Sequence, residues 1–205
     1  MGRVLAMSDI HGQYIPFQQV LYDAKYDPKE DTLILCGDYC DRGPQTKQVI
    51  EEVMSLVAKG AVALKGNHDD WMIRYALREM EIDEESSWLE QGGRETLESY
   101  EDEMDDLYWH ARWMDSNLKL YHETDQFIFA HAGVLPGVSL ESQPPWALLW
   151  RRYQGPCQLG KLVVHGHTPV KEVTQVFDQL FIDTGSVFGG KLSLVDLTNG
   201  IVYAA

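Results

Sequence analysis

Six short apolar runs, each closed by a glycine or a small polar turn, set the strongest constraint on how this chain can fold. An apolar run of this length between turn residues is typical of a buried β-strand. The sequence therefore predicts six buried strands. They occupy residues 3–8, 32–37, 61–66, 126–133, 161–166 and 180–185.

Segments with helical periodicity separate several of these runs. Tyr14, Phe17 and Leu21 recur at the spacing of one helix face, and a second helical pattern follows Pro44. Alternation of strand, loop and helix is the signature of an α/β fold. Residues 191–204 are predicted to form a β-hairpin, because two alternating segments flank an Asn-Gly turn.

A single domain over residues 1–205 is expected, with a helical insertion at about 70–122 that shapes one side of a cleft. The length of 205 residues suffices for one domain with a sizeable core, and no linker-like stretch divides it. Gly92 and Gly93 interrupt the helical pattern. They predict a break between two helices of the insertion.

Charge and cysteine content limit the classes of function. The formal net charge of −15 would repel nucleic acid, so no nucleic-acid partner is expected. No apolar run approaches the roughly 18 residues of a membrane-spanning helix. The N-terminal stretch also lacks the pattern of a secretion signal, so a cytoplasmic protein without a membrane partner is expected. Cys36 and Cys40 could form a redox pair, but packing as small apolar residues is the preferred interpretation, and Cys157 fits a reduced thiol.

Polar side chains follow five of the predicted strands, at the point where each strand ends. In open α/β sheets the binding site forms at these carboxyl ends. A single Asp or His there is more often a hydrogen-bonded structural residue, but convergence from five strand ends is specific. The residues are Asp9, His11, Asp38, Asp41, Arg42, Asn67, His68, Asp69, His131, His165 and His167.

This combination of carboxylate, amide and imidazole groups predicts a metal site. Mixed ligands of these kinds suit Mn²⁺, Fe²⁺ or Zn²⁺. The groups are too many for one ion, and two ions need a shared ligand. Asp38, on the central strand, is the natural bridging carboxylate. The residues therefore predict a dinuclear centre.

Five motifs carry a resemblance to a known family. DIHG, GDYCDRG, GNHD, HAG and HGHTP occur in an order and spacing that resemble those of the calcineurin-like metallophosphoesterases. The form GD-x-x-DRG followed by GNH is similar to the phosphoprotein phosphatase branch, particularly its small bacterial and phage-type members. The resemblance covers nearly the whole chain. It implies a four-layer α/β/β/α β-sandwich with the metals at one edge.

The resemblance also implies a ligand set for two divalent metal ions, with manganese preferred and iron or zinc as alternatives. His165 is not expected to be a ligand, and His110 and His122 are interpreted as surface or packing residues. The first metal would be held by Asp9 and His11, the second by Asn67, His131 and His167, and Asp38 would bridge the two.

The substrate-binding and acid groups follow from the same resemblance. Arg42 would bind the substrate phosphate. A second arginine is expected after LLW, and Arg152 matches the Trp-x-Arg spacing better than Arg151. His68 would be the general acid for the leaving oxygen, oriented and kept protonated by Asp41.

Three functions are compatible with these residues. The preferred one is hydrolysis of phosphomonoesters, as a phosphoprotein Ser/Thr (or Tyr) phosphatase, by in-line attack of a water held between the metals. The alternative is hydrolysis of bis(5′-nucleosyl)-tetraphosphates, because relatives of similar size carry the same metal site. A non-catalytic scaffold is disfavoured, since no expected ligand is missing.

Overall fold

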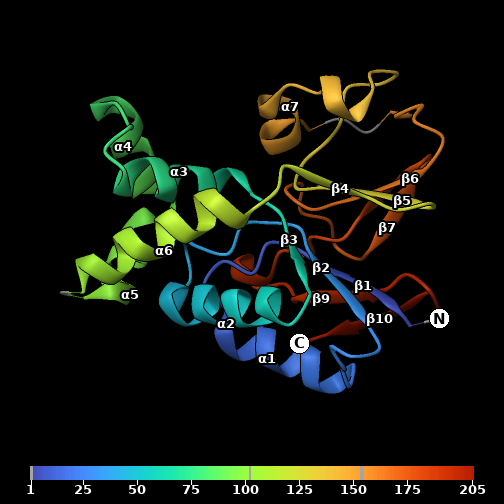
Figure 1. Cartoon of the computed structure of the whole chain (residues 1–205), viewed down its shortest axis with the longest axis horizontal. Coiled ribbons are helices and arrows are strands. Elements are labelled where there is room, and N and C mark those ends of the chain that lie inside the picture. The colour runs from blue at the N-terminus through green and yellow to red at the C-terminus, as the bar shows by residue number, and fades with distance from the viewer. Residues whose placement is uncertain (1, 102, 153–154) are drawn as a thin grey trace.

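Two five-stranded sheets form the centre of the structure (Figure 1). The computed structural model describes residues 2–101, 103–152 and 155–205. The first sheet has the order β10–β9–β1–β2–β3, with β1 Val4–Met7, β2 Thr32–Leu35, β3 Val62–Ala63, β9 Ser193–Asp196 and β10 Ile201–Ala204. The second has the order β4–β5–β6–β8–β7, with β4 Tyr121–Glu123, β5 Phe127–Ala130, β6 Leu162–His165, β7 Thr174–Val176 and β8 Gln179–Phe181.

Alternating side chains explain why the two sheets pack face to face. In β1, Leu5 and Met7 belong to one buried cluster, whereas Ala6 belongs to another. The Ala6 cluster also contains Phe129 and Val164 of the second sheet. Successive side chains of a strand point to opposite faces, so one face of the first sheet packs on the second sheet and the other on helices.

Helices cover both outer faces. Helices α1 (Tyr14–Asp23) and α2 (Thr46–Ala58) lie on the first sheet. The short helix α7 (Pro145–Trp150) packs on the second sheet through Leu148, which lies in a cluster with Ile128 and Val163. The order helix, sheet, sheet, helix confirms the predicted four-layer α/β fold.

A group of helices joins the two sheets in sequence and lies to one side of them in Figure 1. A π-helical turn, η1, contains Gly92 with φ of 119°, at the predicted helix break. None of the helices in the described part of the chain is long and apolar enough to cross a membrane. The helices are α3 (Asn67–Ala76), α4 (Ile82–Trp88), η1 (Leu89–Gly93), α5 (Arg94–Tyr100) and α6 (Met104–Asn117).

Some strands differ from those predicted. The strand expected over 61–66 is limited to β3, after which Leu64 makes only an isolated bridge to Lys119. Strands β4 and β7 were not predicted, because they are short and largely polar or exposed. Cys36 and Cys40 are free thiols buried in different apolar clusters, which supports the packing interpretation.

Parallel pairing brings the strand ends together. Strands β1, β2 and β3 run parallel in the first sheet, as do β5, β6 and β8 in the second. Within each sheet, the loops that follow these strands therefore emerge at one edge. The ring of His131, after β5, reaches the Cys36 carbonyl after β2, so the two edges meet. The candidate site is built from these loops.

Candidate active site

The loops that follow β1 and β2 are joined along their backbones. The N–H of Asp9 donates to the carbonyl of Gly37 over 3.0 Å, and the N–H of His11 to that of Asp38 over 2.9 Å. Both loops use left-handed backbone, which non-glycine residues adopt where the surrounding structure enforces it, often at functional sites. Six of the ten residues predicted for the site share a positive φ: Asp9, His11, Asp38, Asp41, Arg42 and His167.

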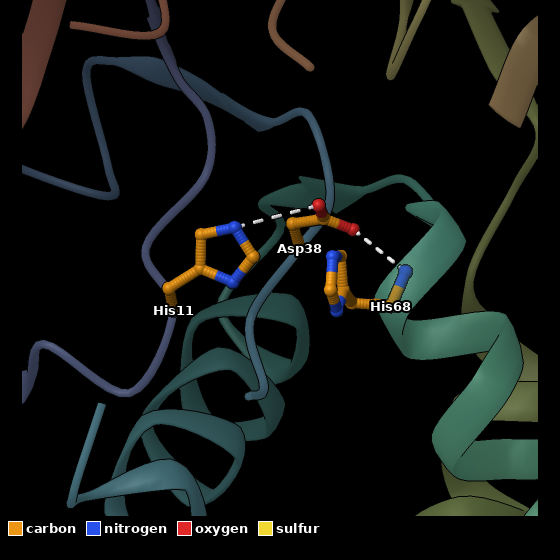
Figure 2. A group of neighbouring side chains, drawn as sticks. All are labelled: His11, Asp38 and His68. Carbon is orange, nitrogen blue, oxygen red and sulfur yellow. Dashed lines mark hydrogen bonds and ion pairs between the residues drawn. The ribbon is translucent and has the colours of Figure 1, made fainter. Parts of the chain in front are cut away.

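Asp38 lies between two histidines that come from different sheets. Its Oδ2 atom is 3.6 Å from Nε2 of His11 and 3.5 Å from Nε2 of His131. Its Oδ1 atom accepts the backbone N–H of His68 over 3.0 Å, and Figure 2 shows the His11 and His68 contacts together. One buried carboxylate is thus shared by two groups of potential metal ligands, His11–Asp38–His68 and Asp38–His131–His167.

The rings of His11 and His131 are oriented to offer lone pairs to a cation. Their Nδ1 atoms donate to the carbonyls of Cys40 and Cys36, over 2.8 and 2.9 Å, because a carbonyl oxygen can only accept. Burial lowers the pKa of both rings, so each Nε2 carries a lone pair. The lone pair of His131 lies 3.0 Å from Oδ1 of Asn67, a second acceptor. A metal ion bound by both atoms would remove the repulsion between them.

Buried carboxylates make the same site favourable for cations. Burial, and then the charge of Asp183, raises the pKa of Asp9 well above its ordinary value. Burial, and then the charge of Asp9, raises the pKa of Asp38 in the same direction. Bound cations stabilise the charged forms of such groups. Asp9 is also held in place, since its Oδ2 accepts from Ser8 Oγ over 2.5 Å and from the His167 N–H over 3.0 Å.

His68 and Asp41 form a buried pair beside the predicted metal ligands. We call these ligands, Asp9, His11, Asp38, Asn67, His131 and His167, the ligand cluster. Nδ1 of His68 lies 2.6 Å from Oδ2 of Asp41. Burial raises the pKa of Asp41 to about 7 and lowers the pKa of His68 to about 3, so both shifts favour one proton shared between the two groups. This contact is one through which Asp41 could orient the His68 ring, as the resemblance implies. The resemblance also implies that Asp41 keeps His68 protonated, and burial acts against that protonation.

Two residues of the helical segment hold Asp41, and sequence reasoning missed both. Nε1 of Trp88 donates to Oδ2 of Asp41 over 2.8 Å, and Oγ1 of Thr96 donates to Oδ1 over 2.7 Å. The Asp41 N–H donates in turn to Thr96 Oγ1 over 2.8 Å. Gly92 permits the close approach of this segment, since a Cβ there would lie 2.4 Å from the backbone nitrogen of Arg42.

A cavity of about 190 Å³ opens onto the ligand cluster and is lined by both predicted arginines. Nη1 of Arg42 donates to Nε2 of His11 over 2.6 Å, and Nε of Arg152 donates to Nε2 of His167 over 3.3 Å. The guanidinium of Arg42 thus places positive charge at the lone pair of His11. Nε2 of His167, by contrast, lies between Arg152 and the Trp150 carbonyl, which is 3.2 Å away. The other predicted site residues that line this cavity are Asp9, Asp38, Asn67, His68 and His167.

The neighbouring arginine is placed differently. Arg151 does not line this cavity, and its carbonyl accepts the N–H of Gly133 over 3.1 Å.

Among the other histidines, His165 packs edge-on against Phe181, with ring centroids 4.4 Å apart. His110 shares a 2.7 Å hydrogen bond with the Tyr100 hydroxyl and does not line the cavity.

The cavity also contains residues that were not selected from the sequence. Asp183 follows β8 and faces the site, so the strand-end rule that found Asp9 would have found it too. Gln91 comes from the helical segment. Trp150 and Phe188 complete the aromatic part of the lining, and nothing in their local sequence distinguishes them from core aromatics.

A two-sheet sandwich that gathers carboxylate, amide and imidazole groups beside two arginines defines a metal-dependent hydrolase of phosphate esters. The chain belongs to the calcineurin-like phosphoesterase family, whose model matches residues 2–194. Enzymes of this family use two divalent metal ions, and the shared Asp38, the inward-facing lone pairs and the buried carboxylates fit such a centre.

Relatives within the family differ in the substrates their names state. The asymmetrical bis(5′-nucleosyl)-tetraphosphatase PrpE of Anoxybacillus flavithermus is 31% identical, over 91% of this chain and 87% of its own. Serine/threonine-protein phosphatase 2 of Escherichia coli is 27% identical, over 93% and 90%. A crystal structure provisionally assigned as a diadenosine tetraphosphatase covers all of this chain and 93% of its own, with a TM-score of 0.72 and 21% identity, and so supports the fold.

Proposed function

We propose that the chain hydrolyses phosphate esters with two divalent metal ions, preferably Mn²⁺, bound at the Asp38 cluster. Asp9, His11 and Asp38 would hold one ion. Asp38 would hold the second together with Asn67, His131 and His167. When bound, the metals supply Lewis acidity and lower the pKa of water. The observation that carries this proposal is the placement of Asp38 Oδ2 within 3.6 Å of one imidazole Nε2 and 3.5 Å of another.

The two arginines would bind and orient the phosphate. Arg42 and Arg152 line the cavity beside the ligand cluster, and a guanidinium fork matches a phosphate in bidentate geometry, which a lysine does poorly. Both arginines contact a predicted histidine ligand, Arg42 at His11 and Arg152 at His167. They can exchange these contacts for phosphate oxygens with only side-chain movement.

The leaving oxygen would take its proton from His68. The proton shared with Asp41 occupies the Nδ1 side of the ring, so a proton on Nε2 can face the cavity. As Nε2 gives up that proton, the proton shared with Asp41 would settle on Nδ1, so the ring would end neutral and Asp41 would end as a carboxylate. General acid catalysis matters most for an alkoxide leaving group, whose own basicity is high.

Two substrate classes are supported. A phosphoprotein substrate, preferred from the sequence, is supported by the similarity to the Escherichia coli phosphatase. A bis(5′-nucleosyl)-tetraphosphate is supported by the PrpE relative, and a specific observation favours it: exposed aromatic rings line the cavity together with the arginines. We therefore place the dinucleotide first.

The test uses metal-stripped protein reloaded with Mn²⁺. Diadenosine tetraphosphate and Ser, Thr and Tyr phosphopeptides are assayed side by side, with the nucleotide products resolved. A higher kcat/KM for the dinucleotide supports ranking it above the phosphoprotein. Faster release of phosphate from peptides reverses that ranking, and absence of turnover for every phosphoester, with two metals bound, contradicts the proposed function.

A further inference from the structure

An unusually exposed phenylalanine lies at the candidate active site. Phe188 is 65% exposed and ends the short 3₁₀ turn Ser186–Phe188. The turn is bounded by Gly185 and Gly189, both in the left-handed conformation with φ of 70° and 85°. The N–H of Phe188 donates to the Gly185 carbonyl over 2.9 Å. An ordered turn therefore presents this ring outward, where it contributes little to the core.

The phosphate-binding arginine lies on this ring. The guanidinium carbon of Arg42 is 5.1 Å from the centroid of Phe188, a cation–π contact, while Nη1 of Arg42 reaches His11. Arg42 thus connects the aromatic ring to the ligand cluster. A group that stacks on the open part of Phe188 would be joined to phosphates bound at Arg42.

A second aromatic ring lines the same cavity. Trp150, at the end of α7, is 39% exposed. Its ring packs edge-on against Trp71 at 4.9 Å between centroids, and Trp71 packs against His68 at 5.2 Å. Trp150 is therefore held in position by Trp71, which also contacts His68. Part of the Trp150 surface faces the cavity.

We propose that Phe188 and Trp150 are the base-binding residues of this site and that its substrate is a nucleoside polyphosphate, with phosphates at Arg42 and Arg152. The proposal rests on the function proposed above. A flat aromatic surface stacks on any nucleobase, and stacking on an aromatic side chain is a common source of nucleotide affinity. Single exposed aromatics are ordinary on protein surfaces. Two that share one cavity with two arginines match a ligand that has flat rings joined to an anionic chain.

A phosphoserine or phosphothreonine side chain offers no comparable surface. Its aliphatic part has only one or two carbon atoms, so it would bury little apolar surface against Phe188 or Trp150. Phosphotyrosine would gain such area and is the alternative aromatic ligand. The experiment therefore compares a dinucleotide, a phosphoserine peptide and a phosphotyrosine peptide.

The decisive variants are Phe188→Leu, which keeps an apolar side chain but removes the ring face, and Phe188→Tyr, which restores it. The exposed position makes both compatible with folding. Phe177→Leu is the matched control: Phe177 is 66% exposed but precedes β8, whose opposite end leads to the site. Trp150→Phe tests the second ring with its packing on Trp71 retained.

Two measurements are made on each variant. The first is the ratio of kcat/KM for diadenosine tetraphosphate to that for a phosphoserine peptide, with a phosphotyrosine peptide assayed in parallel. The second is the Kd of a methylene-bridged, non-hydrolysable dinucleoside tetraphosphate. Phe188→Leu is expected to lower the ratio and raise the Kd by about ten-fold, Phe188→Tyr to reverse most of both changes, and Phe177→Leu to leave both unchanged.

An equal loss on both substrates would show that Phe188 serves only to hold Arg42, and would overturn the base-binding assignment. A phosphotyrosine peptide that is cleaved faster than the dinucleotide, and that alone loses rate in Phe188→Leu, would overturn the nucleotide assignment. If no phosphoester is hydrolysed, the proposed function fails. The Kd of the non-hydrolysable analogue still decides whether Phe188 binds a base.

Discussion

His68 has two possible uses in the structure, because it lies in a potential ligand group with His11 and Asp38 and also pairs with Asp41. The pairing favours the acid role. His68→Asn should leave two Mn²⁺ ions bound per chain. It should slow alkyl phosphates and phosphopeptides by roughly 10²–10⁴-fold, and p-nitrophenyl phosphate far less, since that leaving group needs no proton.

Metal analysis and a series of leaving groups test this together. Loss of one metal from His68→Asn would assign the ring as a ligand. Equal slowing of good and poor leaving groups would argue against proton donation.

The adjacent arginines form a natural matched pair. Arg152 lines the cavity with the ligand residues, whereas Arg151 does not. Arg152→Ala should raise KM for substrate and Ki for inorganic phosphate by roughly 10–100-fold, because a charge-assisted contact to phosphate is lost. Arg151→Ala should change both constants much less. Steady-state kinetics with phosphate as competitor measures the difference. A larger effect of Arg151→Ala than of Arg152→Ala would reassign phosphate binding to Arg151.

At the scale of elements, the helical segment holds Asp41, and through it the segment would support the proposed catalysis. Trp88 and Thr96 donate to its two carboxylate oxygens. Trp88→Phe removes one donor and keeps most of the buried ring, while Thr96→Val keeps the shape of the side chain. Each should destabilise the fold by about 1–3 kcal/mol, since a buried acceptor loses its partner.

The kinetic signature of these variants separates positioning from simple support. Both should slow substrates with poor leaving groups more than p-nitrophenyl phosphate, as His68→Asn does. Thr96→Ser, which keeps the hydroxyl, should restore the rate on poor leaving groups. A loss that is uniform across leaving groups would assign Trp88 and Thr96 a structural role alone.

Element-level patterns explain which features could be predicted. The site residues at strand ends could be predicted because apolar runs stop abruptly at Asp9, Asp38 and His131. Parallel pairing within each sheet and packing of the two sheets on each other then bring these residues together. The contact of Trp88 with Asp41 spans 47 positions and depends on a helix break, so no local pattern encodes it. Strands β4 and β7 lacked a signal because their side chains are mostly polar or exposed.

At the scale of the whole molecule, metal binding should add to stability. Asp9, Asp38 and Asp183 are buried together, so ions that neutralise them favour the folded chain. At a free Mn²⁺ concentration 100 times Kd, the expected gain is about 2.7 kcal/mol, or roughly 5–10 °C in Tm for a chain of this size. Thermal unfolding of stripped and reloaded protein measures this shift.

Asp38→Asn provides the control for that measurement. The amide keeps the size of the side chain but removes the shared charge. Most of the Mn²⁺-dependent rise in Tm should disappear, together with activity and metal occupancy. An Asp38→Asn protein that is stabilised by Mn²⁺ as strongly as the parent chain would contradict the dinuclear assignment.

The placement of Asp38 between His11 and His131 also has a kinetic consequence. His11 follows a strand of the first sheet and His131 a strand of the second, and the ring of His131 donates to the Cys36 carbonyl across that boundary. A chain refolding from denaturant cannot assemble the complete ligand set until the two sheets have docked. Binding of Mn²⁺ in a stopped-flow experiment should therefore lag behind the return of secondary structure. The rate of Mn²⁺ binding would then report the rate at which the two sheets dock.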